Sequence, residues 1–238
     1  MKEIYNPAFV ENLFDKMSGS YERMNKITSF GFSSFWRKKC VNELALENAE
    51  VVVDLMTGMG ECWSYIFNKT GDKVQLIAID FSSQMLKQAE IKRQKLPEYN
   101  IQIMRENVFS NTIATASADF VISCYGLKTF SELQLKQLVA EIDRILKAGG
   151  EFSIVEVSVP TNVMLRWLYM FYIKNVIPVL GWLFLGNPET YKMLGIYTEK
   201  YRNTKAIVKL FQDKNLEVEY LEYFYGCASG IKGKKKLV

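Results

Sequence analysis

The stretch Val51-Val52-Val53-Asp54-Leu55-Met56-Thr57-Gly58-Met59-Gly60-Glu61 decides the fold. An apolar run that leads directly into two glycines is typical of a buried strand followed by a tight turn and a helix. The glycines let a ligand lie against bare backbone at this turn. Asp80 lies 20 residues beyond Gly60, at the end of the next apolar run, where a carboxylate accepts hydrogen bonds from both hydroxyls of a ribose. Together these features predict a nucleoside site.

Short apolar runs alternate with helical segments along the rest of the chain. We expect strands at 51–55, 74–80, 101–104, 119–124, 152–157 and 216–223, and a last strand before the C-terminal lysines. We expect helices within 7–47 and at 62–69, 82–96, 131–147 and 203–213. Strands that are apolar on both faces and separated by helices indicate a parallel sheet covered on both sides. The sequence therefore predicts a doubly wound α/β fold. Residues 1–48 would form an N-terminal helical cap and 49–238 the ligand-binding domain, with a helical insertion at about 160–200.

The composition excludes several classes of protein. With 49% hydrophobic and 24% charged residues, the chain has the composition of a globular protein. Histidine is absent, which excludes a histidine-based triad and a histidine-ligated metal, and we expect no metal site. The four cysteines, at 40, 62, 124 and 227, form no C-x-x-C pair, and we recognise no secretory signal before them. We therefore expect reduced thiols in a cytoplasmic protein.

The positive charge gathers at the C-terminal end of the chain. The net charge of +4 equals the charge of the lysines at 232, 234, 235 and 236. Because the rest of the chain is neutral, we expect no nucleic-acid partner. These lysines form either a solvated, frayed end or a weak attraction for anionic lipid.

The most apolar stretch spans residues 163–185. Its length suits a bilayer, but Arg166, Lys174 and Pro178 interrupt it, and a charge near a helix centre costs about 2.5 to 3.5 kcal/mol on insertion. We predict that it is not a transmembrane helix. Two interpretations stay open: helices that simply cover the sheet, or helices that form a wall around an apolar substrate or rest on a membrane.

The residues after the glycines narrow the choice of nucleoside. A dinucleotide site requires the pattern G-x-G-x-x-G, with pyrophosphate at the helix N-terminus. Here Glu61, Cys62 and Trp63 follow Gly60, so an acid and an indole occupy that place. A cationic ligand without phosphate fits better, because its amino group can bind Asp54 or the carbonyls of the loop. We therefore predict S-adenosyl-L-methionine as the cofactor.

Several motifs extend the nucleoside pattern over nearly the whole chain. They are Phe14-Asp15, Ser20-Tyr21-Glu22-Arg23-Met24-Asn25, Ser29-Phe30-Gly31, Phe35-Trp36-Arg37-Lys38, the loop 54–61, residues 80–86, Tyr125-Gly126-Leu127-Lys128, residues 144–150 and Pro188-Glu189-Thr190-Tyr191. With them the chain resembles class I S-adenosylmethionine-dependent methyltransferases, and among these the ubiquinone/menaquinone-biosynthesis C-methyltransferases. The resemblance implies a Rossmann-like seven-stranded methyltransferase sheet, with N-terminal helices and a helical insertion after the fifth strand.

The resemblance also implies roles for individual residues. Met59 and its neighbouring glycines would line the methionine part of the cofactor, Asp80 would hold the ribose, and Asn107 and Val108 would edge and cover the adenine. The complete set of expected cofactor-binding residues is Asp54, Thr57, Gly58, Met59, Gly60, Asp80, Asn107, Val108 and Cys124. Three positions depart from the family pattern, which has Asp, Arg and Asn where this chain has Glu61, Lys128 and Thr129.

Carbon methylation of a hydroquinone requires loss of a phenolic proton, which places charge on the ring carbon that attacks the methyl group. Without histidine, the expected catalytic residues are Glu61, Tyr21 and Lys128, together with a bound water. Each has a structural alternative: a carboxylate at a helix N-terminus, a packed ring and a surface lysine. Glu156 is either a carboxylate that faces the substrate or a solvated residue.

The sequence thus predicts an S-adenosylmethionine-dependent methyltransferase for an apolar aromatic or quinone-like acceptor, which it modifies by C-methylation. Two alternatives stay open. One is an enzyme of the rhodoquinone-biosynthesis type, which exchanges a quinone methoxy group for an amino group, and the other is a non-catalytic protein that binds the cofactor or a quinone. Peripheral membrane contact and a homodimer are also left open.

Overall fold

The computed structural model describes residues 3–19, 21–185 and 188–237. Ser20, which belongs to a motif quoted above, lies outside the described residues. Residues 1–2, 186–187 and 238, which fall within the predicted cap, insertion and C-terminal end, lie outside them as well.

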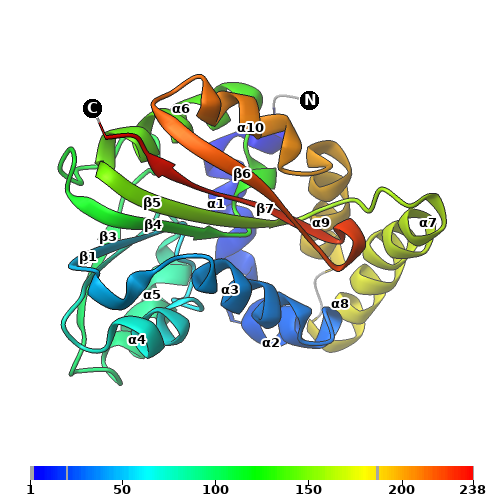
Figure 1. Ribbon diagram of the computed structural model, residues 1–238. Helices are drawn as coiled ribbons and strands as arrows, with labels where there is room; N and C mark the ends of the chain where they lie inside the picture. Colours follow the sequence, from blue (N-terminus) through cyan, green and yellow to red (C-terminus); the bar gives the residue numbers. More distant parts are fainter. Residues whose placement is uncertain (1–2, 20, 186–187, 238) are drawn as a thin grey trace.

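The described residues form one seven-stranded sheet with the strand order β3-β2-β1-β4-β5-β7-β6 (Figure 1). The strands are β1 (Val51–Leu55), β2 (Gln75–Asp80), β3 (Asn100–Arg105), β4 (Ala118–Cys124), β5 (Leu146–Val157), β6 (Leu216–Tyr223) and β7 (Ala228–Lys235). Strands β1 to β5 pair in parallel, and β7 runs antiparallel to both β5 and β6. The doubly wound α/β fold and the C-terminal hairpin are therefore confirmed.

Helices cover both faces of the sheet, as the apolar strands require. One face carries α3 (Phe32–Asn42), α4 (Trp63–Thr70) and α5 (Ser83–Arg93), and the other carries α6 (Glu132–Ile145) and α10 (Lys205–Gln212) (Figure 1). Alternate residues of β1 enter the two cores: Val52 packs with Trp36 and Trp63, and Val53 packs on the α6 side. Because the strands are parallel, the carboxyl ends of β1, β2 and β4 meet at one edge.

The remaining helices form a layer beyond that edge. They are α1 (Pro7–Met17), α2 (Tyr21–Thr28), α7 (Val163–Phe171), a π-helical turn (Tyr172–Val176), α8 (Ile177–Leu185) and α9 (Pro188–Tyr201). A third core of Met17, Met24, Ile173, Ile177 and Tyr191 joins the N-terminal helices to the insertion. Short 3₁₀ turns lie at Glu3–Tyr5, Leu46–Asn48, Leu127–Thr129 and Phe224–Gly226. Within the described part of the chain, one helix, Val163–Leu183, is long and apolar enough to cross a membrane by length and composition alone.

The structure corrects two expectations: that the C-terminal lysines form a frayed end, and that the fifth strand starts at 152. Lys232 and Lys235 belong to β7 and are not a frayed end: Lys232 pairs with Glu43 at 3.0 Å and Lys235 with Asp143 at 3.4 Å. Strand β5 begins at Leu146 rather than at 152, because Leu146 pairs with Ala118 across a register shift. Gly149 lies there at φ +77°, so the glycines that precede the expected strand form an irregularity inside the observed one.

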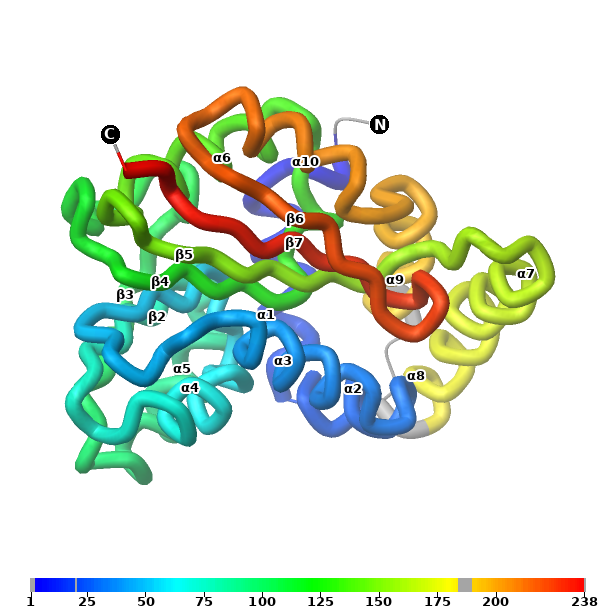
Figure 2. Tube along the Cα trace, viewed as in Figure 1, coloured from blue at the N-terminus to red at the C-terminus, as the bar shows by residue number. Residues whose placement is uncertain are grey.

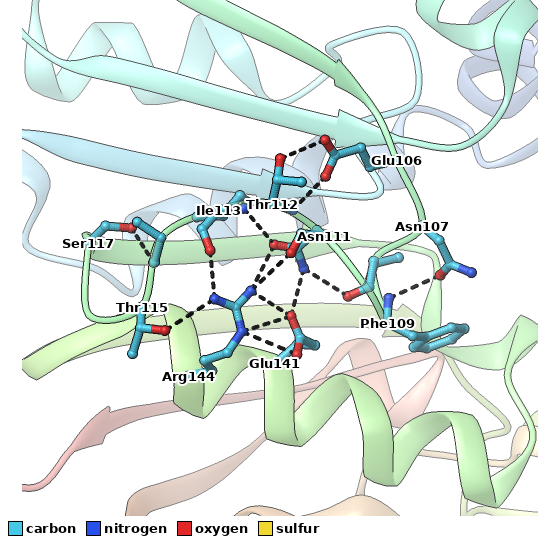
Figure 3. A network of polar contacts seen from close by, with 12 residues as sticks. Glu106, Asn107, Phe109, Asn111, Thr112, Ile113, Thr115, Ser117, Glu141 and Arg144 are labelled. Carbon is cyan, nitrogen blue, oxygen red and sulfur yellow. Dashed lines mark hydrogen bonds and ion pairs between the residues drawn. The ribbon is translucent and has the colours of Figure 1, made fainter.

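Arg144 of α6 fixes the long loop between β3 and β4 (Figure 3). Its guanidinium pairs with Glu141 at 2.7 Å and donates to the Ile113 carbonyl at 2.6 Å and to Asn111 Oδ1 at 3.0 Å. Asn111 in turn donates to the Val108 carbonyl at 3.1 Å. The network therefore holds the segment that follows β3 against α6.

We expect Arg144→Ala to lower the free energy of unfolding by about 2 kcal/mol, because it leaves acceptors of charge-assisted hydrogen bonds unpaired. Arg105, whose side chain is 62% exposed, supplies the control, since Arg105→Ala removes a surface pair with Glu11 worth about 0 to 1 kcal/mol and one long hydrogen bond, of 3.4 Å, to the Phe81 carbonyl. Urea unfolding followed by circular dichroism measures both. Equal losses for the two variants would contradict the role given to the network.

Candidate active site

Hydrogen bonds to residues of β1, β2 and α4 hold the loop after β1 in place. The Gly58 amide donates to Asp80 Oδ2 at 2.9 Å, which ties the loop to the end of β2. The Trp63 indole donates to Thr57 Oγ1 at 2.9 Å, and that hydroxyl donates to Asp54 Oδ2 at 2.6 Å. Gly60 has φ +80°, and a Cβ there would lie 2.6 Å from the Trp63 ring. Only glycine therefore fits at this point of the turn.

This loop forms one wall of a crevice at the carboxyl ends of β1, β2 and β4. Asp54, Thr57, Gly58, Glu61, Asp80 and Cys124 line it, all from the sequence-predicted set, together with Tyr21. Phe14 of α1 and Tyr21 of α2 lie across the crevice with their rings 6.0 Å apart. The free space between them is small, about 50 Å³.

The crevice has an excess of buried carboxylates. Burial, together with the neighbouring Glu61 and Asp80, raises the pKa of Asp54 to about 7. Burial also raises the pKa of Asp80 to about 6, although the amides of Ser82 and Gly58 donate to it. A cationic ligand would relieve this repulsion. The donor set therefore fits S-adenosylmethionine, with its ammonium and sulfonium groups, better than a phosphate.

Glu61 is held by a buried ion pair that the sequence reasoning missed. Its Oε1 lies 3.2 Å from Arg37 Nη2 of α3, and the side chains of both residues are more than nine-tenths buried. Its Oε2 accepts the Met59 amide at 2.9 Å. Glu61 thus lies just before the N-terminus of α4 and turns its side chain back to the loop and to α3.

A larger apolar cavity of about 320 Å³ adjoins the crevice. Residues of α3, α7, the π-helical turn and α9 line it, including Trp36, Leu165, Tyr169, Tyr172, Ile173 and Leu194. The crevice and the cavity share two titratable residues, Tyr21 and Tyr125, which line both spaces. Among the described residues, no acid lines both. These two side chains mark the junction between the crevice and the cavity.

Lys128 and Glu156 form a second buried ion pair beside the cavity. Lys128 Nζ lies 2.8 Å from Glu156 Oε1 and donates to the Tyr125 carbonyl at 2.9 Å. Lys128 lines the cavity, so the alternative of a surface lysine is wrong. Glu156 is fully buried and also accepts the Lys128 and Val157 amides, so it is not solvated.

Other expected residues lie outside the crevice. Met59 and Gly60 shape the loop but are not among the residues that line the crevice, and Asn107 and Val108 line a neighbouring narrow space that shares Phe81 with it. Tyr125, like Arg37, was missed by sequence reasoning. It follows β4 at φ +69°, and its hydroxyl donates to the Ser33 carbonyl at 2.6 Å. The motifs quoted above contained both residues, but no periodicity placed either one at the site.

The fold and the site define an S-adenosylmethionine-dependent methyltransferase. Within this class, the chain belongs to the ubiE/COQ5 methyltransferase family, which it matches over residues 1–235. The protein is therefore an enzyme, and the non-catalytic alternative is set aside.

Relatives and solved structures agree with this assignment. The chain is 31% identical over 218 residues to the demethylmenaquinone methyltransferase of Thermotoga maritima (91% of each chain) and 29% identical over 220 residues to that of Lactococcus lactis (92% of this chain, 86% of the relative). It shares its fold with a putative methyltransferase of Haloferax volcanii solved with the Trm112 methyltransferase activator. The TM-score is 0.65 at 16% identity, over 94% of this chain and 97% of that one. An Aquifex aeolicus SAM-dependent methyltransferase gives a TM-score of 0.59 at 18% identity, over 84% and 89%.

We expect cofactor affinity and protein stability to respond to pH in opposite directions. The raised pKa values mean that the folded protein keeps the protons of Asp54 and Asp80 at a pH where the unfolded chain has lost them. As the pH rises from about 4 to about 7, the free protein therefore loses stability. Over the upper part of the same window the carboxylates become charged, so S-adenosylmethionine binds more tightly. Titration calorimetry and urea unfolding at several pH values measure the two trends.

Asp54→Asn serves as the control for this prediction, because it removes one titrating group and retains the shape of the side chain. We expect it to flatten both trends and to weaken binding at high pH. An affinity that stays constant between about pH 5 and pH 8 in the unmodified enzyme would contradict the assignment.

Proposed function

We propose that the enzyme transfers the methyl group of S-adenosylmethionine to a ring carbon of a quinol that carries an apolar tail. The main support for this proposal is the junction at Tyr21 and Tyr125, where a crevice rich in carboxylates adjoins an apolar cavity. The cavity suits an apolar ring and the start of its tail. The names of the relatives, demethylmenaquinone methyltransferase, point to the same class of acceptor.

The proposed cofactor site uses the crevice residues in distinct ways. Asp80 accepts the ribose hydroxyls, while Asp54 and the Thr57 to Gly60 loop bind the ammonium end. Asn107 and Val108 border the adenine in the narrow space beside the crevice. Cys124, whose thiol lies 3.5 Å from that of Cys62, packs beneath the cofactor. When bound, the cofactor supplies an electrophilic methyl group.

The division of the chain follows from this arrangement. Residues 1–48 supply Tyr21 and Arg37 and act as the helical cap, and the insertion at about 160–200 supplies the wall of the acceptor cavity. Because the free space of the crevice is small, α1 and α2, the part of the cap beyond the sheet edge, move for the cofactor to enter. The acceptor then meets the crevice after the cap has closed, which excludes water from the reacting atoms.

Three side chains divide the proton chemistry. Glu61, held in place by Arg37, accepts the phenolic proton through a water molecule. Burial and the nearby Glu61 raise the pKa of Tyr21, so Tyr21 stays protonated and donates a hydrogen bond instead of acting as a base. Lys128, held by Glu156 at the cavity, stabilises the phenolate.

The Trp36 indole offers a further donor on the acceptor side. Its Nε1 is buried and has no hydrogen-bond partner within the part of the chain that the structure describes. Trp36 also lines the apolar cavity. A buried donor without a partner is costly, and an oxygen of the quinol would satisfy it.

We expect Glu61→Gln to lower kcat by about 10²-fold or more, because the general base is lost while the shape of the side chain is kept. The dissociation constant for S-adenosylhomocysteine should change much less. Glu47→Gln, on a side chain that is 64% exposed, is the matched control and should leave kcat unchanged. Mass spectrometry of a short-chain demethylnaphthoquinol incubated with methyl-labelled cofactor gives the rate and the product.

The mass of the product also tests the reaction class. Gain of one labelled methyl group with release of S-adenosylhomocysteine is the expected result. A short-chain quinone that carries a methoxy group, incubated in parallel, tests the alternative. Loss of its methoxy group with gain of an amino group would support the exchange reaction instead. A kcat for Glu61→Gln equal to that of the unmodified enzyme would remove Glu61 from the catalytic residues.

A further inference from the structure

The helix formed by α7, the π-helical turn and α8 is apolar on its outer face as well as on its inner face. Its inner face is occupied, because Ile173 and Ile177 pack in the third core. On its outer face Trp167 is 67% exposed and Trp182 is 61% exposed. Only 17% of the most apolar 18-residue window of this helix is buried. Apolar surface of this kind marks an interaction site.

The exposed rings continue around the mouth of the acceptor cavity. Phe30, Leu168 and Phe224 line the cavity and are each half-exposed or more. Phe224 contacts Tyr225, whose ring is also exposed, with the ring centres 5.6 Å apart. We call Phe30, Trp167, Leu168, Phe171, Trp182, Leu183, Phe224 and Tyr225 the apolar rim. Figure 2 shows α7 and α8 extending away from the sheet, so the rim lies at one end of the molecule.

The charges near the rim are mainly positive, although Glu222, two residues before Phe224, is an exposed acid. Residues 163–185 contain no acid, and Arg166 and Lys174 are exposed there, although Lys174 pairs with Glu199. On the N-terminal side the Lys26 carbonyl accepts the amide of Gly31, the residue after Phe30, and Lys39 lies 5.7 Å from the ring centre of Phe35. Arg23 and Lys38 are exposed on the same two helices, α2 and α3, where Glu22 is the one exposed acid among the described residues.

The charge pattern distinguishes between two partners. A second copy of the chain that met this face through a two-fold axis would bring the same cations against each other and would close the mouth of the cavity. A bilayer with anionic headgroups pairs with the lysines instead, accepts the tryptophans at its interface and supplies an apolar molecule directly to the open mouth.

We propose that the apolar rim docks on the surface of an anionic lipid bilayer, with Trp167 and Trp182 inserted at the interface and Lys26 and Lys39 against the headgroups. This inference extends the proposed function, because it explains how an acceptor with a long apolar tail reaches the cavity without crossing water. The acceptor leaves the membrane through the mouth bordered by Phe30, Leu168 and Phe224.

The chain contains its own spectroscopic probes. Of the four tryptophans, Trp36 and Trp63 are buried, whereas Trp167 and Trp182 are exposed on the rim. Adding vesicles of phosphatidylcholine and phosphatidylglycerol to the purified full-length protein should shift the tryptophan emission to shorter wavelength. Flotation of the same mixture should carry the protein to the top of the gradient. Vesicles of phosphatidylcholine alone should bind it more weakly.

Three variants sharpen the test. Trp167→Ser combined with Trp182→Ser should lower the partition coefficient by at least about tenfold. Leu133→Ser, on an equally exposed apolar residue of α6, is the matched control and should leave it unchanged. Lys26→Gln combined with Lys39→Gln should lower binding to anionic vesicles by roughly fivefold per charge, with little effect on neutral ones.

The outcomes separate this inference from the proposed function. The two-tryptophan variant should methylate a short-chain, water-soluble acceptor at the unmodified rate, because neither tryptophan lines the cavity. Absence of vesicle binding by the unmodified protein would overturn the inference and leave the methylation result untouched. Sedimentation velocity that shows a dimer lost in the two-tryptophan variant would also overturn it, in favour of a second copy.

Discussion

The hydrogen bond from the Gly58 amide to Asp80 Oδ2 joins the loop after β1 to the end of β2, and the rest of the site depends on it. The bond fixes the distance between the glycine loop and Asp80, the carboxylate at the end of β2. Trp63 holds the same loop through the hydrogen bond from its indole to Thr57. A loop that is held at both sides presents its backbone in one arrangement, so little ordering is left for the ligand to impose.

Electrostatics makes this crevice selective for a cation. Burial of Asp54, Asp80 and Glu61 in one small space is unfavourable unless positive charge compensates it, and Arg37 is the one cation that lines the crevice in the described structure. The second ion pair, between Lys128 and Glu156, is complete within the protein and lies on the acceptor side. The two sides of the junction therefore differ in their balance of charge.

The sequence predicted the sheet well because local patterns carry that information. Strands that are apolar on both faces, with helices between them, have one common solution, and β6 was predicted at its observed bounds. The start of β5 was wrong because the apolar pattern begins only after Gly149 and Gly150, whereas pairing of Leu146 with Ala118 extends the strand through them. The lysines after 231 were misjudged for a similar reason. Their partners, Glu43 and Asp143, are far away in the sequence.

By itself, the sequence determined the fold class, the glycine loop, the acid at the end of β2 and the cationic character of the cofactor. These depend on short-range spacing and on residue chemistry, which a linear pattern records. Only the tertiary structure decided that Arg37 holds Glu61, that Glu156 holds Lys128 and that Tyr125 stands between the two spaces. The physical reason is that a buried charge is stable only beside its partner, and packing of separate elements selects that partner. The outer face of α7 and α8 was decided in the same way, since hydrophobicity alone does not show which side of a helix remains uncovered.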